Sequence, residues 1–382
     1  MKLDHIAIVG GGIGGLAAAL ALQRAGHRVV VHERSQALRE IGAGLIITAN
    51  ARRALAALGV DARLAEMSSC EPLHHTCDYA TGEIRKALSN DALRDRYGVH
   101  TLGVHRGDLH TVLLDAVRAN DPGCLRTGHA FARLDQDAEG VTVAFQNGAT
   151  DRADVLIGAD GNASAVRSFL VPGESTRFNG QVAFRALMPM DLVPSRPRAL
   201  RMAMNPSPRR YLLHYPLRNG TIMNVIGCGQ SEAWEEEGWS IPATNEEFAR
   251  AYADFAPDLV EMIHAIPPGA LFKWGLRDRE PMAQWVIGRV GMLGDAAHPM
   301  TPFLGQGACL ALEDALLLGR AFSAAATPQE ALQRYEAARR PRGNGVQLMS
   351  REEGRALQDP AIPRRTAVDR GLLEYDPVTT PV

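Results

Sequence analysis

The sequence lacks the cysteine spacing of a disulfide framework or a metal site. Its five cysteines are an odd number, they are widely separated, and none belongs to a CxxC pair. They are Cys70, Cys77, Cys124, Cys228 and Cys309. We therefore expect reduced cysteines that serve mainly in packing, and no bound metal.

The chain also lacks an excess of charge of either sign. The formal net charge is -2 and the pI is about 6.6. Nucleic-acid binding normally demands a clustered basic face, so this balance excludes an obvious role on DNA or RNA. A small molecule is the expected partner.

Long apolar runs are missing as well. The uncharged segment 6–22 falls below the roughly 18 apolar residues of a membrane-spanning helix, and the glycines between Gly10 and Gly14 would weaken such a helix. No other long apolar run occurs. We expect no membrane segment, and a cytoplasmic protein.

The N-terminal segment has the pattern of a parallel βαβ unit. An apolar strand at 6–9 leads into a glycine-rich turn, an Ala- and Leu-rich helix ends near Gly26, and a second buried strand covers 27–32. Gly10, Gly12 and Gly15 form a G-x-G-x-x-G motif between strand and helix. Such glycines permit a tight turn and close approach to a pyrophosphate at the helix N-terminus.

Glu33 ends the second strand of this unit. It follows the last motif glycine at the distance at which an acidic side chain accepts hydrogen bonds from a ribose. The motif and Glu33 together predict a bound dinucleotide, but they do not say which one.

Two later turns extend the nucleotide-binding pattern. Asp160-Gly161 follows the apolar strand at 154–158, and Gly294-Asp295 follows another at 290–293, shortly before Gly305-Gln306-Gly307. A nucleotide-contacting segment nearly three hundred residues after the first predicts a long cofactor enclosed by the whole fold. FAD meets that requirement better than NAD.

The pattern of the remaining chain predicts two discontinuous domains, as expected for 382 residues. Helices are expected near 49–58, 106–118, 306–322 and 328–340, and strands near 141–145, 211–216 and 222–227. We assign 1–70, 100–177 and 285–345 to the nucleotide-binding domain. Residues 71–99 and 178–284 form a substrate-binding domain, and 346–382 a C-terminal helix and tail.

The three motifs, in this order, resemble those of the single-component (group A) FAD-dependent aromatic hydroxylases, as does the segment His105-Arg106-Gly107-Asp108-Leu109-His110. Strand 211–218 is similar to its counterpart in salicylate hydroxylase and 3-hydroxybenzoate 6-hydroxylase. Segments 274–281 and 298–300 resemble 6-hydroxynicotinate 3-monooxygenase. The resemblance implies an α/β fold: a Rossmann-like FAD-binding domain of the glutathione-reductase type, with an inserted β-sheet substrate domain and C-terminal helices.

The activity implied by this resemblance is hydroxylation of a small aromatic acid of the salicylate or hydroxybenzoate type. NADH or NADPH would reduce FAD, and O2 would react through a flavin C4a-hydroperoxide. An N-heteroaromatic acid such as 6-hydroxynicotinate is the alternative substrate, although the apolar segment 42–47 has no counterpart of the histidine in the hydroxynicotinate enzyme. A plain NAD-dependent dehydrogenase and a non-catalytic flavin-binding protein are further alternatives. A monomer or homodimer is expected.

The resemblance also implies roles for individual residues at the cofactor. Gly10, Gly12, Gly15 and Glu33 would bind the ADP half of FAD, with Arg34 beside the adenosine and Arg106 near the flavin and pyrophosphate. Asp160 would support the cofactor, and Asp295 would bind the ribityl or pyrophosphate region. Gly305, Gln306 and Gly307 would lie against the isoalloxazine, where the helix dipole stabilises negative charge on the reduced ring.

The sequence also supplies candidates for the substrate side of the site. His214, Tyr215 and His298 are candidates to draw a proton from a phenol or to position it, since a phenol with a pKa of about 10 is a poor donor at neutral pH. Arg185 or Arg218 is a candidate to bind a carboxylate in a bidentate pair. An apolar lining that excludes water is predicted from Leu45, Ile47, Met300, Pro302 and Phe303. Packing is the competing interpretation for His214, Tyr215 and the apolar residues. His298 could instead only shape the loop before Pro299, and each arginine could be solvated or face the flavin.

Overall fold

The computed structural model describes residues 3, 5–38, 42–231, 241–359 and 361–382. One half of the fold is built on a six-stranded sheet with the order β18-β19-β11-β1-β2-β7. The strands are β1 (Ile6–Val9), β2 (Val29–His32), β7 (Leu125–Arg126), β11 (Val155–Gly158), β18 (Val286–Ile287) and β19 (Val290–Met292). Strand β1 pairs in parallel with β2 and β11, and β11 with β19, which confirms the predicted βαβ unit.

Both faces of this sheet are covered by other elements, because its strands are apolar on both sides. Every residue of β1, β2 and β11 is buried. The helices of this part are α1 (Ile13–Arg24), α2 (Ala49–Ala57), α3 (Asp61–Glu66), α5 (Arg106–Asn120) and α6 (Ala165–Leu170). Two small sheets accompany them: β8 (Phe131–Gln136) with β9 (Val141–Phe145) and β10 (Thr150–Ala153), and β3 (Gly44–Ile47) with β6 (Leu102–His105).

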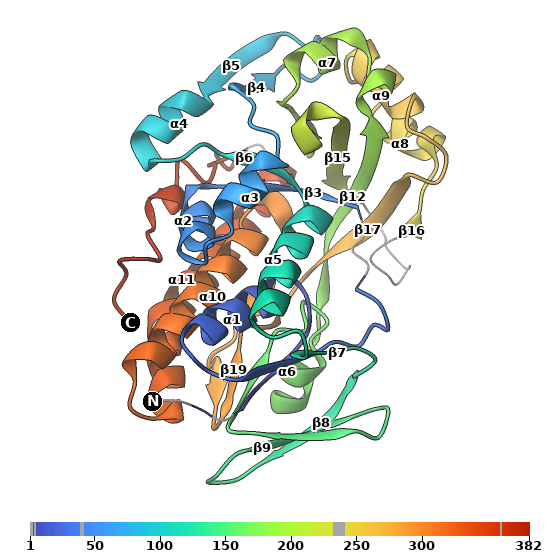
Figure 1. The fold of residues 1–382 in the computed structure, drawn as a ribbon. Coiled ribbons are helices and arrows are strands. Elements are labelled where there is room, and N and C mark those ends of the chain that lie inside the picture. The colour runs from blue at the N-terminus through green and yellow to red at the C-terminus, as the bar shows by residue number, and fades with distance from the viewer. Residues whose placement is uncertain (1–2, 4, 39–41, 232–240, 360) are drawn as a thin grey trace.

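An eight-stranded sheet forms the second half of the molecule, in the order β16-β17-β12-β15-β14-β13-β4-β5 (Figure 1). Its strands are β4 (Leu73–Cys77), β5 (Ile84–Ser89), β12 (Arg177–Pro189), β13 (Ala203–Ser207), β14 (Arg210–Leu217), β15 (Ile222–Gln230), β16 (Ile241–Pro242) and β17 (Leu271–Asp278). The hairpin of β4 and β5 joins this sheet through β13, so the segments 71–99 and 178–284 share one sheet.

The outer face of the large sheet is covered by short helices. These are α7 (Ser195–Leu200), α8 (Asn245–Ala251) and α9 (Pro257–His264), while α4 (Asn90–Tyr97) follows the β4–β5 hairpin. Phe184 of β12 stacks on Phe248 of α8 with ring centroids 4.7 Å apart. The opposite face of the sheet is therefore the one that turns toward the nucleotide-binding half.

Two long helices close the fold. They are α10 (Gly307–Ala324) and α11 (Pro328–Gln358), which lie beside α1 and α2 in Figure 1. The prediction that the last helix ends near Arg340 was wrong, because α11 continues through Pro341, and the expected domain boundary at 345 falls inside it. Buried contacts beyond the proline, including Gly343 and Val346, outweigh the hydrogen bond that proline removes. Short 3-10 turns occur at Met190–Leu192, Arg218–Gly220, Gly294–Ala296, Pro302–Leu304 and Leu372–Glu374.

Candidate functional site

A cleft runs along the glycine-rich turn at the carboxyl ends of the parallel strands. One cavity of about 390 Å³ includes Glu33, Arg34 and Asp160 in its lining, and an adjoining cavity of about 200 Å³ includes Asp295 and Gly307. Both are lined by Gly12, Arg106, Ala159 and Gly161, so the two cavities form one elongated space. Segments far apart in sequence thus meet at one site, as the switch point of a doubly wound sheet predicts.

Close packing explains two of the three motif glycines. Gly10 has a φ of +111°, and a Cβ there would lie 2.4 Å from the carbonyl oxygen of Ala159. A Cβ on Gly15 would lie 1.9 Å from the carbonyl oxygen of Gly10. Gly12 differs, because no atom of the described residues lies within 4 Å of its Cβ position. The close packing of Gly10 and Gly15 therefore fixes the backbone before and after Gly12, where space is left open.

The N-terminus of α1 faces this open space. Gly12 is its N-cap residue, and the described residues supply neither a side-chain cap nor an acidic group in the first turn. The exposed N–H groups and the helix dipole favour a negatively charged group here. Glu33 stiffens the turn, since its carboxylate accepts hydrogen bonds from the backbone N–H of Gly11 and of Ser35, both at 2.8 Å. This arrangement fits a pyrophosphate with its ribose.

Asp160 and Asp295 approach the cleft from two further turns. Asp160 accepts hydrogen bonds from the hydroxyl of Ser164 (2.5 Å) and the backbone N–H of Ala165 (2.7 Å), so it also caps α6. Burial raises the pKa of both aspartates. The charges of His298 and Arg106 oppose that shift in the pKa of Asp295. Arg106 therefore places a positive charge near Asp295, in the middle of the cleft.

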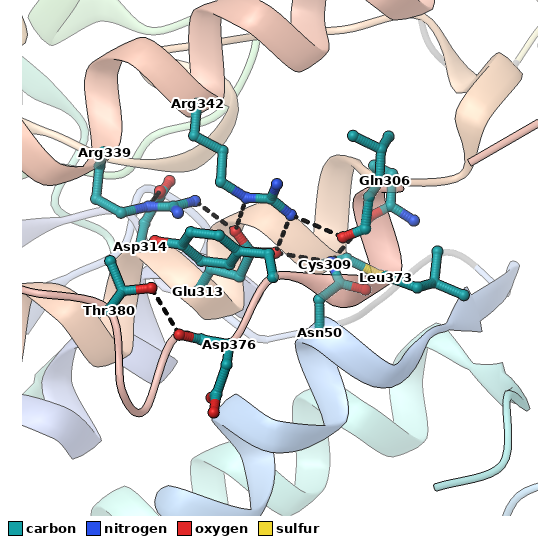
Figure 2. A network of polar contacts seen from close by, with 12 residues as sticks. Asn50, Gln306, Cys309, Glu313, Asp314, Arg339, Arg342, Leu373, Asp376 and Thr380 are labelled. Atoms are coloured by element: carbon teal, nitrogen blue, oxygen red, sulfur yellow. Dashed lines mark hydrogen bonds and ion pairs between the residues drawn. The ribbon is translucent and has the colours of Figure 1, made fainter. Parts of the chain in front are cut away.

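The turn at Gly305–Gly307 presents its backbone, and not the Gln306 side chain, to the cleft. Gly305 has a φ of +64°, and α10 begins at Gly307, which lines the smaller cavity. The Gln306 amide points into the protein, because its Oε1 accepts a hydrogen bond from Asn50 Nδ2 at 2.9 Å (Figure 2). Its Nε2 donates to Thr48 Oγ1 at 3.2 Å. A cofactor at this point would meet the helix N-terminus and its dipole.

The large sheet turns Arg185 and Tyr215 toward the nucleotide-binding half. Tyr215 pairs with Asn224, and Arg185 with Ile226, so these side chains share one face. Asn224 Oδ1 accepts a hydrogen bond from Gly44 N (3.0 Å), and a Cβ on Gly44 would lie 2.7 Å from the Tyr215 hydroxyl. This face therefore lies directly against β3 of the nucleotide-binding half.

His214 points the other way because side chains alternate along a strand. It is completely buried, neither ring nitrogen has a hydrogen-bond partner among the described residues, and burial lowers its pKa to about 4. The charges closest to it are those of Arg196 and Asp258, on the helices of the outer layer. The structure does not bring His214 to the cleft.

Replacement of His214 by leucine is expected to leave the reaction intact. No polar partner is lost, so we expect kcat and KM within about twofold of the wild-type values and a change in the free energy of unfolding within about 1.5 kcal/mol. Steady-state kinetics and urea denaturation check this. The comparison variant is Tyr215→Phe, for which we expect kcat/KM to fall about fivefold with the loss of one hydrogen bond of about 1 kcal/mol. A large fall in kcat/KM in His214→Leu would show that this histidine takes part in the reaction.

His298 also lies away from the cavity walls. It is fully buried, stacks on Trp285 with centroids 5.0 Å apart, and its Nε2 lies 2.6 Å from Asp314 Oδ2. These contacts give the ring a structural role behind the Gly294–Asp295 turn. Its prediction as a proton acceptor for substrate has no support in this position.

Asp314 supports this turn by accepting a hydrogen bond from Gly294 N, and its ionisation affects the stability of the fold. The positive charges of His298 and Arg339 outweigh the cost of burial and hold the pKa of Asp314 at about 2, below the ordinary value of 3.8. A depressed pKa in the folded state stabilises the fold above pH 3.8, and this stabilisation is lost as the pH falls through about 2.

Asp314→Asn is therefore expected to lower the free energy of unfolding by about 3–5 kcal/mol at pH 7, since it removes one partner of a buried ion pair. The difference from wild type should shrink as the pH falls below 4. Urea unfolding of both proteins at pH 7, 5 and 3 measures it. A difference that stays constant across this range would contradict the ionised assignment.

The remaining candidates divide between cleft and core. Leu45 lines the smaller cavity, and Pro302 is exposed next to the Gly305 turn. Ile47 is completely buried in the main core, and Met300 packs beside Leu304 and Leu310. Arg218 is bound by Asp108, with its Nη2 2.7 Å from Oδ1, and so is not free for a substrate carboxylate. Phe303 packs edge-on against Tyr211.

Sequence reasoning missed Asn50, Asn224 and Trp274. Asn50 supports Gln306, Asn224 binds the backbone of Gly44, and Trp274 lies under the guanidinium of Arg185 at 5.3 Å. Asn50 lies within a predicted amphipathic helix, where a buried asparagine has no distinctive pattern. The alternation of β15, together with a chosen face, would have indicated Asn224.

Two absences complete the description of the site. Within the described ranges, no group of three or more His, Cys, Asp or Glu side chains is arranged to hold a metal ion. Among the same residues, no helix combines the length and apolar character needed to cross a membrane.

The fold and the cleft together define a flavoprotein that binds FAD. The comparisons agree: residues 4–350 match the family described as "FAD binding domain", and the chain belongs to this family of FAD-dependent enzymes. It is 34% identical over 370 residues to 3-amino-4-hydroxybenzoate 2-monooxygenase of Streptomyces platensis, covering 96% of this chain and 92% of that protein. It is 35% identical over 364 residues to 3-hydroxybenzoate 6-hydroxylase of Polaromonas naphthalenivorans, covering 94% and 89%.

A solved structure shows the same arrangement. HpxO of Klebsiella pneumoniae, in complex with FAD and uric acid, superposes with a TM-score of 0.85 at 28% identity, covering 98% of this chain and 93% of that chain. The fold class and the FAD cofactor expected from sequence are confirmed. The relatives are named as monooxygenases and hydroxylases, which favours that class over a plain dehydrogenase.

Proposed function

We propose that this enzyme hydroxylates a small aromatic acid, of the salicylate or hydroxybenzoate type, with O2 and NADH or NADPH as co-substrates. Two relatives that are at least 34% identical are named for hydroxylation of benzoic acids. The substrate would lie between the cofactor cleft and the face of the large sheet that carries Arg185 and Tyr215. When bound, FAD supplies the redox chemistry that activates O2 with electrons from the nicotinamide.

The observation that carries the proposal is the partly buried guanidinium of Arg185, which has no acidic partner among the described residues. Its Nε is buried without a hydrogen-bond partner. Burial lowers its pKa, and it acts electrostatically on Arg106 of the cleft and on Tyr215. A buried cation without an acid is costly, so an anionic ligand is its natural partner. A carboxylate matches the fork of a guanidinium in geometry.

Tyr215 is assigned the role of hydrogen-bond donor. Burial raises its pKa well above the ordinary value, so the hydroxyl keeps its proton at neutral pH. It can thus donate to a ring oxygen of the substrate but cannot remove a proton from it. Leu45 and Met300 would keep water from the reacting ring, which limits wasteful oxidation of the nicotinamide.

The test is the visible spectrum of the purified protein, followed by oxidation of NADH and of NADPH in the same cuvette. Salicylate, 3-hydroxybenzoate and 6-hydroxynicotinate are added in turn, and products are identified by mass. A flavin spectrum with oxidation stimulated by a benzoic acid, and a product heavier by one oxygen, supports the proposal. Stimulation by 6-hydroxynicotinate alone would assign an N-heteroaromatic acid. Flavin reduction without product for any acid would overturn the hydroxylase assignment.

We further propose a cytoplasmic enzyme that is a monomer or homodimer. Support comes from the near-neutral charge and the dispersed cysteines. Size-exclusion chromatography with light scattering determines the oligomeric state.

A further inference from the structure

Two neighbouring acids on α10 support both turns that face the cofactor. Asp314 Oδ2 accepts a hydrogen bond from Gly294 N at 3.1 Å, next to Asp295. Glu313 Oε1 accepts from Asn50 Nδ2 at 2.7 Å, and the same amide donates to Gln306 Oε1 at 2.9 Å. Glu313 and Asp314 therefore reach the Gly294–Asp295 turn directly and the Gly305–Gly307 turn through Asn50.

Two arginines of α11 balance these acids, and we call Glu313, Asp314, Arg339 and Arg342 the ion cluster (Figure 2). Arg339 Nε lies 2.7 Å from Asp314 Oδ1, and its Nη2 lies 2.8 Å from Glu313 Oε2. Arg342 Nε donates to Glu313 Oε2 at 2.7 Å. The two acids and Arg339 are fully buried. The four members of the cluster thus carry two charges of each sign in a buried region, and His298 lies beside them with its Nε2 2.6 Å from Asp314 Oδ2.

The C-terminal segment closes the cluster. The ring of Tyr375 lies 3.9 Å from the guanidinium carbon of Arg342 and 5.2 Å from that of Arg339. Arg342 also donates to the carbonyl oxygen of Leu372 at 3.1 Å, and Arg53 of α2 donates to that of Tyr375 at 3.0 Å. Residues 372–375 therefore cover the ion cluster, which hydrogen bonds connect to the two turns at the cofactor cleft.

We propose that the ion cluster and Asn50 are positioning residues for the flavin-facing end of α10, and that the charge balance of the cluster sets the redox potential of the bound flavin. The inference rests on the proposed function in that it needs FAD in the cleft. Reduction makes the flavin more negative. A net charge in a low-dielectric region acts over a longer distance than one in water. It therefore changes the affinity of the protein for reduced flavin relative to its affinity for oxidised flavin.

Opposite charge changes supply the main test. Glu313→Gln leaves the cluster with a net positive charge and should raise the midpoint potential, with about a tenfold change in the ratio of reduced to oxidised affinity, or about 30 mV for a two-electron couple. Arg342→Gln leaves a net negative charge and should lower the potential by a similar amount. The matched control is Arg340→Gln, which removes a charge from the solvent side of α11 and should leave the potential unchanged. Potentials are measured on FAD-loaded proteins by equilibration with redox dyes.

A loosened structure would shift both variants in the same direction, whereas the proposal requires opposite signs. Equal or absent shifts in the two folded, FAD-loaded variants would overturn it. Tyr375→Leu decides the matter if a charge variant does not fold, because it changes no formal charge. We expect about a tenfold increase in the Kd for FAD, measured by flavin fluorescence, with tight binding restored in Tyr375→Phe. An unchanged Kd in Tyr375→Leu would contradict the positioning role.

These measurements need no substrate, so they separate the inference from the proposed function. A wild-type protein that binds FAD but hydroxylates none of the acids tested would count against the proposed function alone. An active hydroxylase whose flavin midpoint potential is unchanged by the charge variants of the ion cluster would count against the inference alone. A protein that cannot be loaded with FAD would overturn both.

Discussion

Gly12→Val is expected to abolish tight FAD binding while the fold of the apoprotein persists. A side chain at Gly12 meets no atom of the described residues within 4 Å, so it adds no internal clash. It would instead fill the space in front of the α1 N-terminus, where a pyrophosphate has to lie. Loss of two charge-assisted hydrogen bonds of about 1.5–3 kcal/mol each corresponds to a loss in affinity of about 100-fold or more.

The comparison variant is Gly15→Val, which should instead damage the fold. Its Cβ would lie 1.9 Å from the carbonyl oxygen of Gly10, so the strand and helix would have to separate. Circular dichroism and thermal unfolding of the apoproteins, with FAD titration by fluorescence, distinguish the two outcomes. Tight FAD binding in Gly12→Val would show that the pyrophosphate lies elsewhere.

Arg185→Met is expected to lower kcat/KM for the aromatic acid by about 100- to 1000-fold while the protein keeps its flavin. The loss of a bidentate, charge-assisted pair of about 3–4 kcal/mol gives this factor. Methionine preserves the length of the chain and its packing on Trp274, so the fold should not suffer. Steady-state kinetics with the acid, and with its neutral amide, measure the effect.

The neutral amide gives the more decisive comparison in this experiment. If Arg185 binds the carboxylate, the wild-type enzyme should strongly prefer the acid, and Arg185→Met should lose most of that preference. Arg218→Met serves as the control, because Arg218 is paired with Asp108 and is largely solvent-facing. An acid preference that survives in Arg185→Met would assign the carboxylate to another residue.

Much of the nucleotide-binding half could be predicted from sequence because its signals are local. The spacing of Gly10, Gly12 and Gly15, the strand that precedes them and the position of Glu33 are all contained in one βαβ unit. The structure places Gly12, Glu33, Arg34, Arg106, Asp160, Asp295 and Gly307 around one cleft. Their individual roles toward FAD stay predictions, although FAD itself is confirmed by the family and by a related complex.

The substrate side was harder to predict because it depends on which face of a strand is buried against what. His214 and Tyr215 are neighbours with opposite directions, and sequence alternation alone cannot say which direction leads to the cofactor. The contact between Gly44 and Asn224, residues 180 positions apart, decides it in favour of Tyr215. Pro341 illustrates the same limit. The helix was predicted to end just before this proline, but buried contacts after it stabilise the helix as far as Gln358.

The sequence by itself determined the βαβ unit and the order of the turns that line the cleft, because short-range backbone geometry and helix polarity require particular residues at particular spacings. The tertiary structure alone decided that no acidic side chain among the described residues pairs with Arg185, that His298 contacts Asp314, and that Glu313 reaches Gln306 through Asn50. Those facts depend on pairings between residues on separate elements. Charge balance in a buried region is a property of the whole assembly of elements, and no single segment of sequence contains it.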